Sequence, residues 1–158
     1  IIGGPIESAS ARERLAGYRA TLTAHDLKVD EALLLAGDGT PAAGEKGLRH
    51  LMALPANRRP TAIFCYNDLT AIGALHAAHR LGLAVPAELS LVGFDNIALS
   101  ALSWPPLTTV DQRKQGMGRL AAHIILDLLA GAEVVADVIM RGRLIKRESS
   151  ASVCAGGS

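Results

Sequence analysis

The stretch TAIFCYNDLTAIGALHAAHRLGLAVPAELSLVG, residues 61–93, contains strand, helix and strand signals in that order. Residues 61–66 (TAIFCY) are rich in residue types that favour β-strands. Asn67 and Asp68 then supply helix-cap chemistry, and Gly82 stops the predicted helix. Residues 89–93 (LSLVG) form a second predicted strand. Two strands joined through a helix predict a parallel pair in one sheet.

The same alternation continues on the N-terminal side of this stretch. Residues 1–3 indicate the end of a strand, and Ser10 with Glu13 has the spacing of a capping box at a helix start. Residues 33–35 (LLL) are expected to form a buried strand. Thr40 followed by Pro41 then suits the start of a further helix.

The alternation also continues on the C-terminal side. Residues 95–107 form a long, proline-bearing loop, and loops of this length are often functional. Residues 116–129 are predicted to lie in an amphipathic helix, which Gly131 ends. Residues 136–140 and 144–147 are expected to be strands.

These elements predict an α/β fold with an open parallel sheet and helices on both of its faces. Ligands of such sheets bind beyond the carboxyl ends of the strands. This rule selects the four loops that begin at Pro5, Gly37, Asn67 and Asp95. The same loops hold most of the polar residues that interrupt apolar runs, so we expect the functional site there.

The composition is that of one globular domain, since 49% of the 158 residues are hydrophobic and 20% are charged. The net charge is only +1, no Lys/Arg block is denser than residues 141–147, and no aromatic residues are interleaved with that block, which argues against a nucleic-acid-binding surface. No apolar run is long enough to cross a membrane, and no signal peptide opens the chain. Cys65 and Cys154 offer no disulfide framework, so we expect a reduced, cytoplasmic setting. Because residues 1–5 (IIGGP) start inside an apolar segment, we expect a piece of a longer protein.

The sequence lacks the motifs of the common enzyme classes, namely G-x-S-x-G, a Walker loop, H-E-x-x-H and C-x-x-C. Asp68 and Asp95 both follow strands and could form a glycosidase pair, but a helix cap and a ligand hydrogen bond explain them better. His76 and His79 have a metal-compatible spacing, yet no further ligand lies one helical turn away. We therefore expect a binding protein that is not an enzyme and holds neither a metal nor a cofactor.

Several residues suit a sugar, which needs charged or amide groups for its hydroxyls and an apolar face for its C–H surface. Arg14, Asn67 and Asp95 meet the first need, with Arg14 expected in the first turn of its helix. The alternatives are a solvated charge for Arg14 and turn or cap roles for the other two. Phe94 and Trp104 could provide the apolar face.

Two apolar segments are candidates for contacts with other protein surfaces. Residues 97–102 (IALSAL) carry no charge, which is unusual for an exposed loop and indicates an interaction site. The alternative is a loop folded back onto its own core. The stripe of residues 117–129 forms the second apolar surface.

A set of motifs is spread over almost the whole chain. The motifs are residues 10–17 (SARERLAG), 60–62 (PTA), 66–68 (YND), 92–95 (VGFD), 105–110 (PPLTTV), Gln112 and 146–150 (KRESS). In this order they resemble the effector-binding core of the LacI/GalR repressor family. The element PPLTTV followed by a helix is quite specific to that family.

The resemblance implies a two-lobed core of the periplasmic binding protein-like (type I) kind, preceded by a helix-turn-helix headpiece. A small effector, usually a sugar and here expected to be a monosaccharide, binds between the lobes. Residues 1–110 would belong to the C-terminal lobe, and 111–135 would be a crossover and a helix of the N-terminal lobe. Residues 136–150 would return to the C-terminal lobe, and 151–158 would be a flexible tail.

The resemblance also implies roles for individual residues. Arg14, Asn67 and Asp95 match positions that grip the effector, and Gln112 matches a residue near the crossover strands. Gly39 departs from the family, which often carries a ligand-stacking aromatic residue there, so the ligand class stays open.

A homodimer and operator DNA are the partners that the resemblance implies, and no membrane is expected. DNA would be bound only through the missing headpiece. The predicted dimer contacts are Ile72, His76, Ile97, Leu99 and Leu102. The alternative is a periplasmic sugar-binding protein of a transport system, which shares the fold. The PPLTTV element and the C-terminal RESS favour the repressor.

Overall fold

A computed structural model of the chain describes residues 1–133 and 138–152. Its helices are α1 (Ala9–Ala24), α2 (Pro41–Met52), α3 (Asp68–Arg80), α4 (Ala98–Leu102) and α5 (Lys114–Leu129). Two short 3-10 helices are η1 (Glu31–Leu33) and η2 (Ala56–Arg58). The strands are β1 (Ala62–Phe64), β2 (Ser90–Phe94), β3 (Thr108–Asp111) and β4 (Arg143–Ile145).

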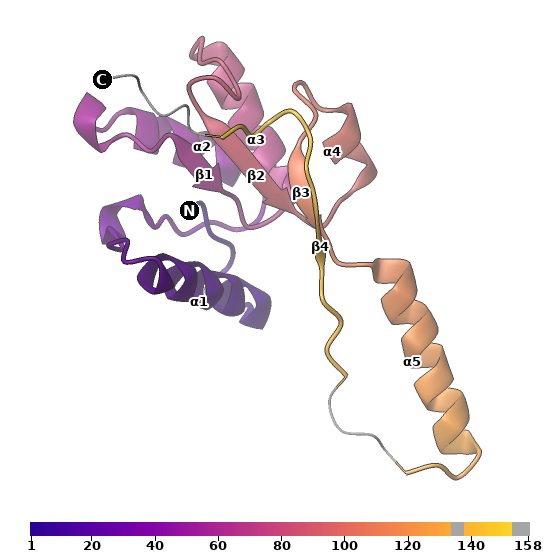
Figure 1. Ribbon diagram of the computed structural model, residues 1–158. Helices are drawn as coiled ribbons and strands as arrows, with labels where there is room; N and C mark the ends of the chain where they lie inside the picture. Colours follow the sequence, from indigo (N-terminus) through magenta and orange to yellow (C-terminus); the bar gives the residue numbers. More distant parts are fainter. Residues whose placement is uncertain (134–137, 153–158) are drawn as a thin grey trace.

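The four strands form one sheet in the order β1-β2-β3-β4. The β1–β2 and β2–β3 pairs are parallel, as predicted, with Ile63 opposite Leu91. Ile2 extends the sheet beyond β1, because it bridges both Leu35 and Cys65 in parallel. Helices α2 and α3 lie together on one side of this sheet and α1 lies on the other (Figure 1). The predicted α/β layers are therefore confirmed.

The predicted open parallel sheet is mixed at one edge, because β4 runs antiparallel to β3. The chain leaves the main body after β3, continues into α5 and then returns beside β3, which reverses its direction (Figure 1). The return strand lies at Arg143–Ile145 instead of the predicted 144–147. Of the other predicted strand, residues 138–140 form none, while residues 136 and 137 lie outside the described residues. Residues 153–158 of the predicted tail also lie outside them.

The predicted buried strand at residues 33–35 is reduced to one bridging residue, Leu35. The backbone N–H of Leu33 donates to the carbonyl of Asp30 at 3.0 Å, and that of Leu34 donates to the carbonyl of Glu31 at 3.1 Å. This 3-10 turn uses backbone donors that a strand would need for its neighbours. The apolar run alone does not show that a 3-10 turn, and not a strand, takes up these N–H groups.

The predicted starts of α2 and α3 are confirmed. The Thr40 hydroxyl accepts from the N–H of Ala43 at 3.2 Å, and the Asn67 side-chain oxygen accepts from the N–H of Thr70 at 2.8 Å. Each bond satisfies a donor that the first helical turn leaves free. Gly82, with φ +70°, follows the end of α3 in the left-handed conformation, as its position predicted.

The predicted capping box of α1 is wrong. The helix begins at Ala9, so that Ser8 occupies the N-cap position and Ser10 is already helical. The Ser10 hydroxyl instead lies 3.1 Å from the Tyr66 hydroxyl, which draws it into a tertiary contact. Arg14 consequently lies in the second turn of α1 and not in the first.

The hydrophobic core lies between the sheet and the α2–α3 pair. Ile2, Leu48, Leu75 and Leu91 are buried there. The two helices are packed unusually closely, and glycines of both helices lie where they touch. This packing fixes α3, and with it the loop at its N-terminus, against the sheet.

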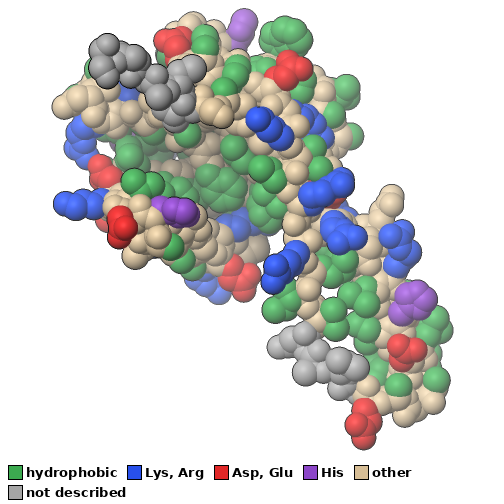
Figure 2. Space-filling model, viewed as in Figure 1, with side chains coloured by type: hydrophobic (Ala, Val, Ile, Leu, Met, Phe, Trp, Pro, Cys, Tyr) green, Lys and Arg blue, Asp and Glu red, His purple; other side chains and the backbone are tan. Residues whose placement is uncertain are grey.

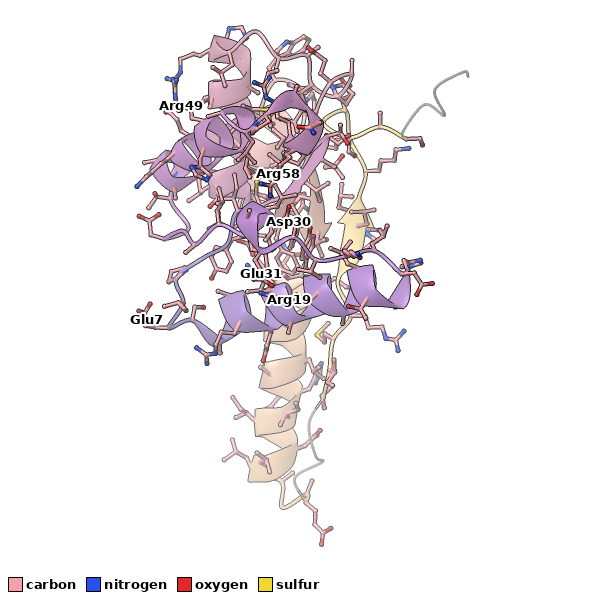
Figure 3. All side chains as sticks on the ribbon, turned by 90° about the vertical axis from the view of Figure 1, so that its left-hand side faces the viewer. Glu7, Arg19, Asp30, Glu31, Arg49 and Arg58 are labelled. Atoms are coloured by element: carbon pink, nitrogen blue, oxygen red, sulfur yellow. The ribbon has the colours of Figure 1, made fainter. Side chains whose placement is uncertain are left out.

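Ion pairs hold α1 and the neighbouring 3-10 helices together. Arg19 donates to Glu31 at 2.7 Å, and Arg58 donates to Asp30 at 2.9 Å (Figure 3). Ala11 is the one residue of α1 that is buried. The pairs are exposed, so each contributes little to stability. The Arg19–Glu31 pair links α1 to η1, and the Arg58–Asp30 pair links η2 to the N-cap residue of η1.

Helix α5 projects from the main body as an arm, and none of its residues is buried (Figure 1). Hydrophobic side chains gather on this arm (Figure 2). The exposed ones in α5 are Met117, Ile124, Ile125, Leu126, Leu128 and Leu129. An apolar face of this size is typical of a surface that packs against further protein. None of the described helices has the length and apolarity that crossing a membrane requires.

Candidate ligand-binding site

Arg14 lies between two aromatic rings at the carboxyl end of the sheet. Its guanidinium carbon is 3.8 Å from the centre of the Phe94 ring and 4.7 Å from the centre of the Tyr66 ring. The guanidinium Nη1 donates to the Tyr66 carbonyl at 2.6 Å. The rings and this bond hold the guanidinium plane in one orientation.

Asp95 faces Arg14 from the end of β2. The Arg14 Nη2 lies 3.7 Å from the Asp95 Oδ1, which is an ion-pair distance but too long for a hydrogen bond. Gln112 donates to that same Oδ1 from the end of β3. Among the described residues, no hydrogen bond reaches Asp95 Oδ2. The side chains of Arg14 and Asp95 remain 16% and 26% exposed, so a ligand can reach both.

The structure thus brings four of the six candidate ligand residues into one cluster: Arg14, Phe94, Asp95 and Gln112. Asn67 lies beside them, and its side chain is largely engaged by the protein. Its oxygen caps α3, and its Nδ2 donates to the Gly39 carbonyl at 3.0 Å. One amide hydrogen of Asn67 remains for a further acceptor.

Tyr66 is a site residue that the motif analysis left without a role. Its ring lies beside Arg14 and also covers Gly4, where an added Cβ would come within 2.6 Å of the ring. Hydrogen bonds with Ser10 and Ser8 lower the pKa of its hydroxyl. Its position at the end of a predicted strand, directly before Asn67, was the signal that could have found it.

Trp104 does not belong to this cluster. It is 86% exposed and lies with Leu83, Val85 and Pro105 beside the end of α3. The expectation that it forms the apolar face of the ligand site is therefore wrong. The reason is the long connection after β2, which folds into α4 and carries Trp104 away from the strand ends.

Asp68 is a structural residue and neither a helix cap nor a catalytic group. It is fully buried, where its two oxygens accept from the Thr109 hydroxyl and, at 2.9 Å, from the N–H of Ile97. Burial raises the pKa of Asp68, while these two hydrogen bonds oppose the rise. A glycosidase pair with Asp95 is excluded, because a sealed carboxyl cannot reach a substrate.

The Asp68→Asn variant is expected to gain stability relative to the wild type as the pH rises. Because the pKa of Asp68 is raised on folding, its proton stabilises the folded state fully below the ordinary pKa of 3.8. That contribution is lost as the pH rises through the folded pKa. Urea unfolding of both proteins from about pH 2 to about pH 8 measures the difference.

Asp30→Asn is the control with the opposite sign. The hydrogen bond from Arg58 lowers the pKa of Asp30 in the folded state. The wild type therefore gains stability relative to Asp30→Asn as the pH rises through the pKa that Asp30 has in the unfolded chain. A difference with the same sign for Asp68 and Asp30 would contradict the assignment of Asp68 as the buried carboxyl.

The residues predicted for a dimer contact lie around α3 and α4. Leu99 and Leu102 are 54% and 79% exposed, so the predicted loop is a short helix that is not folded onto the core. His76 is exposed and Ile97 is half-buried. Ile72 is partly buried and packs against the core, so little of it is available to a partner.

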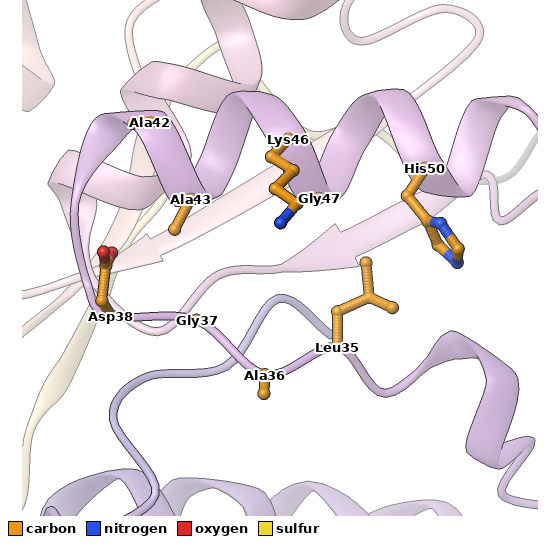
Figure 4. A pocket seen from close by; sticks show the side chains of 9 residues that line it. All are labelled: Leu35, Ala36, Gly37, Asp38, Ala42, Ala43, Lys46, Gly47 and His50. Carbon is orange, nitrogen blue, oxygen red and sulfur yellow. The ribbon is translucent and has the colours of Figure 1, made fainter.

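A separate cavity of about 460 Å³ lies between α2 and the segment from Leu35 to Asp38 (Figure 4). Lys46 and His50 of α2 line it together with Gly47. Neither Arg14 nor Asp95 contributes to it, so it is distinct from the cluster above. Over residues 1–133 and 138–152, no three His, Cys, Asp or Glu side chains are grouped as a metal site.

Comparison with known proteins identifies the class of this fold. A family model described as a periplasmic binding protein-like domain matches residues 1–150. The HTH-type transcriptional repressor CytR of Escherichia coli K12 is 43% identical over 133 residues, which are 84% of this chain and 38% of CytR. The chain thus spans about two-fifths of the length of this curated relative.

Solved structures agree with this class. The transcriptional repressor ascG of Escherichia coli matches with a TM-score of 0.87 and 33% identity, over 95% of this chain and 54% of ascG. A Lac repressor dimer bound to operator and the anti-inducer ONPF matches with a TM-score of 0.84 and 32% identity, over 95% of this chain and 51% of that one. The chain belongs to the periplasmic binding protein-like domain family. Within that class, it is an effector-binding domain of the LacI/GalR family.

Proposed function

We propose that this chain is the effector-binding and dimerisation part of a sugar-responsive transcriptional repressor of the bacterial cytoplasm. A monosaccharide binds in the cleft between this lobe and a second lobe, and it changes the DNA affinity of a helix-turn-helix headpiece elsewhere in the full-length protein. The observation that carries the proposal is the cluster of Arg14, Tyr66, Phe94 and Asp95 at the strand ends.

The chemistry of the cluster favours a ring with several hydroxyl groups. Asp95 Oδ2 accepts from one hydroxyl, and the free edge of the Arg14 guanidinium donates to the neighbouring one. The Phe94 and Tyr66 rings keep that guanidinium in place and add apolar surface. With Gly39 at the rim, the ligand receives no aromatic stacking from that loop.

The second lobe is the expected partner of α5. Residues 111–135 would cross to that lobe and 136–150 would return, which leaves residues 1–110 as the C-terminal lobe. The exposed apolar face of α5 supports this division, because isolated helices rarely keep such a face in water. The named relatives are repressors, so the transport alternative gains no support, and neither does an enzymatic role.

The test of the ligand class is calorimetric titration of the full-length protein with pentoses, hexoses and polyols. At least one of them is expected to bind saturably and to change the affinity for operator DNA in a gel shift. Nucleosides form a second arm, since their ribose carries the same vicinal hydroxyls next to a flat base. Binding of nucleosides alone would contradict a monosaccharide, and no binding in either arm would contradict the hydroxyl-binding site.

Self-association is expected to depend on α4. Leu99→Asp places a charge on an exposed apolar surface, so the full-length protein is expected to shift from dimer to monomer in sedimentation at about micromolar concentration. Leu27→Asp is the matched control, because Leu27 is similarly exposed but lies between α1 and η1. A Leu99→Asp protein that stays dimeric rejects this surface.

A further inference from the structure

The C-terminal segment from Arg147 to Ser150 is bonded to the starts of β2 and β3, away from the strand ends that carry the ligand cluster. Ser149 is buried, and its hydroxyl donates to the Leu91 carbonyl at 2.6 Å and accepts from the Thr108 N–H at 2.8 Å. These bonds fix the segment to β2 and β3. The backbone of Arg147 is therefore held in place, and its side chain extends to the loop after β2.

The two terminal nitrogens of the Arg147 guanidinium donate hydrogen bonds to different parts of the chain. Nη2 donates to the Asn96 side-chain oxygen at 2.8 Å. Nη1 donates to the Ser100 hydroxyl of α4 at 3.0 Å and to the Leu107 carbonyl at 2.7 Å. Only a planar fork with several donors satisfies these acceptors together.

Asn96, which accepts from Nη2, belongs to a strained turn. The backbone φ is +111° at Asp95 and +50° at Asn96, and two successive residues other than glycine rarely adopt positive φ values. The turn is fastened on its other side as well, since the Asn96 N–H donates to Thr109 at 3.3 Å and the Ile97 N–H donates to Asp68 at 2.9 Å. Strain of this kind persists only where neighbours hold it.

We propose that Arg147 is a positioning residue of the ligand site: it holds the Asp95–Asn96 turn in its strained conformation and ties that turn to α4. Asp95 then presents its carboxylate to Arg14 and the ligand because the residue after it cannot relax. The inference rests on the proposed function for its effect on a sugar. The conformation of the turn can be measured without any sugar.

Amide hydrogen exchange of the full-length protein without ligand is the first test. In Arg147→Met and Arg147→Lys, amides of residues 95–102 are expected to exchange at least about tenfold faster. Amides of the core helix α3 are expected to keep their wild-type rates. Arg143→Met is the matched control, because Arg143 is exposed on neighbouring β4 and makes no side-chain hydrogen bond among the described residues.

Affinity for the tightest-binding monosaccharide of the panel is the second test. Both Arg147 variants are expected to bind it about tenfold more weakly, and Arg143→Met as tightly as the wild type. Unchanged exchange at 95–102 overturns the proposal, and so does equal acceleration throughout α3, which indicates a general loss of stability. Full rescue by Arg147→Lys overturns it too, because charge alone would then suffice. A wild type that binds no sugar rejects the proposed function, whereas the exchange rates still decide whether Arg147 holds the turn.

Discussion

Gly44→Ala and Gly73→Ala are each expected to lower the free energy of unfolding by about 3 kcal/mol or more. A Cβ on Gly44 would lie 1.9 Å from the Thr70 carbonyl oxygen, and one on Gly73 would lie 1.9 Å from the Pro41 carbonyl oxygen. Both obstacles are backbone atoms, so no side-chain rotation relieves them. The added methyl groups must push α2 and α3 apart, which opens the core beneath them.

Urea unfolding followed by circular dichroism measures this loss. Gly17→Ala in α1 is the matched control, since no atom lies within 4 Å of its added Cβ. That variant is expected to gain about 0.5–1 kcal/mol from helix propensity. Wild-type stability in both Gly44→Ala and Gly73→Ala would show that the helices are not in such close contact.

Arg14→Met and Asp95→Asn are each expected to weaken monosaccharide binding at least tenfold while the protein stays folded. Hydrogen bonds to charged groups contribute about 1.5–3 kcal/mol when buried, which corresponds to roughly ten- to 150-fold in affinity. Arg14→Met keeps an unbranched stem between the Phe94 and Tyr66 rings but loses the donors. Asp95→Asn keeps the shape of the side chain but loses its charge.

The double variant tests whether the two residues act as a unit. Because Arg14 and Asp95 lie 3.7 Å apart, their effects are expected to be non-additive by about 0.5–3 kcal/mol in calorimetric titration. Arg12→Met is the control on the same helix, where Arg12 donates to the carbonyls of Ile6 and Glu7 on the outside of the protein. Unchanged affinity in both single variants would remove Arg14 and Asp95 from the site.

The position of the candidate site could be predicted from sequence because its cause is local. Strand signals before Asn67 and Asp95, and the helix signals after Thr40 and Asn67, follow from residue types and spacing within a few positions. Parallel strands end at the same edge of a sheet, so the residues after them meet there whatever the rest of the chain does. Asn67 and Asp95 were found in this way. Arg14 was instead predicted from a place in the first turn of its helix, and the structure has it in the second turn.

The details of the site depend on partners that are distant along the chain. Gln112 could be aligned with the family, but its bond to Asp95 joins residues from two strands. Tyr66 became a site residue through contacts with Gly4, Ser10 and Arg14, which local spacing does not reveal. Trp104 was misplaced because aromatic character does not show which way a long connection folds.

The sequence by itself determined the alternation of elements, the caps of α2 and α3, and the edge of the sheet at which polar residues gather. Only the tertiary structure decided that β4 runs antiparallel, that residues 33–35 form no strand, and that Asp68 is sealed inside. The physical reason is the range of the interactions. Helix caps and turns are satisfied by neighbours within about four residues. The pairing of a strand, or the burial of a carboxyl, depends on which distant segments supply its hydrogen bonds.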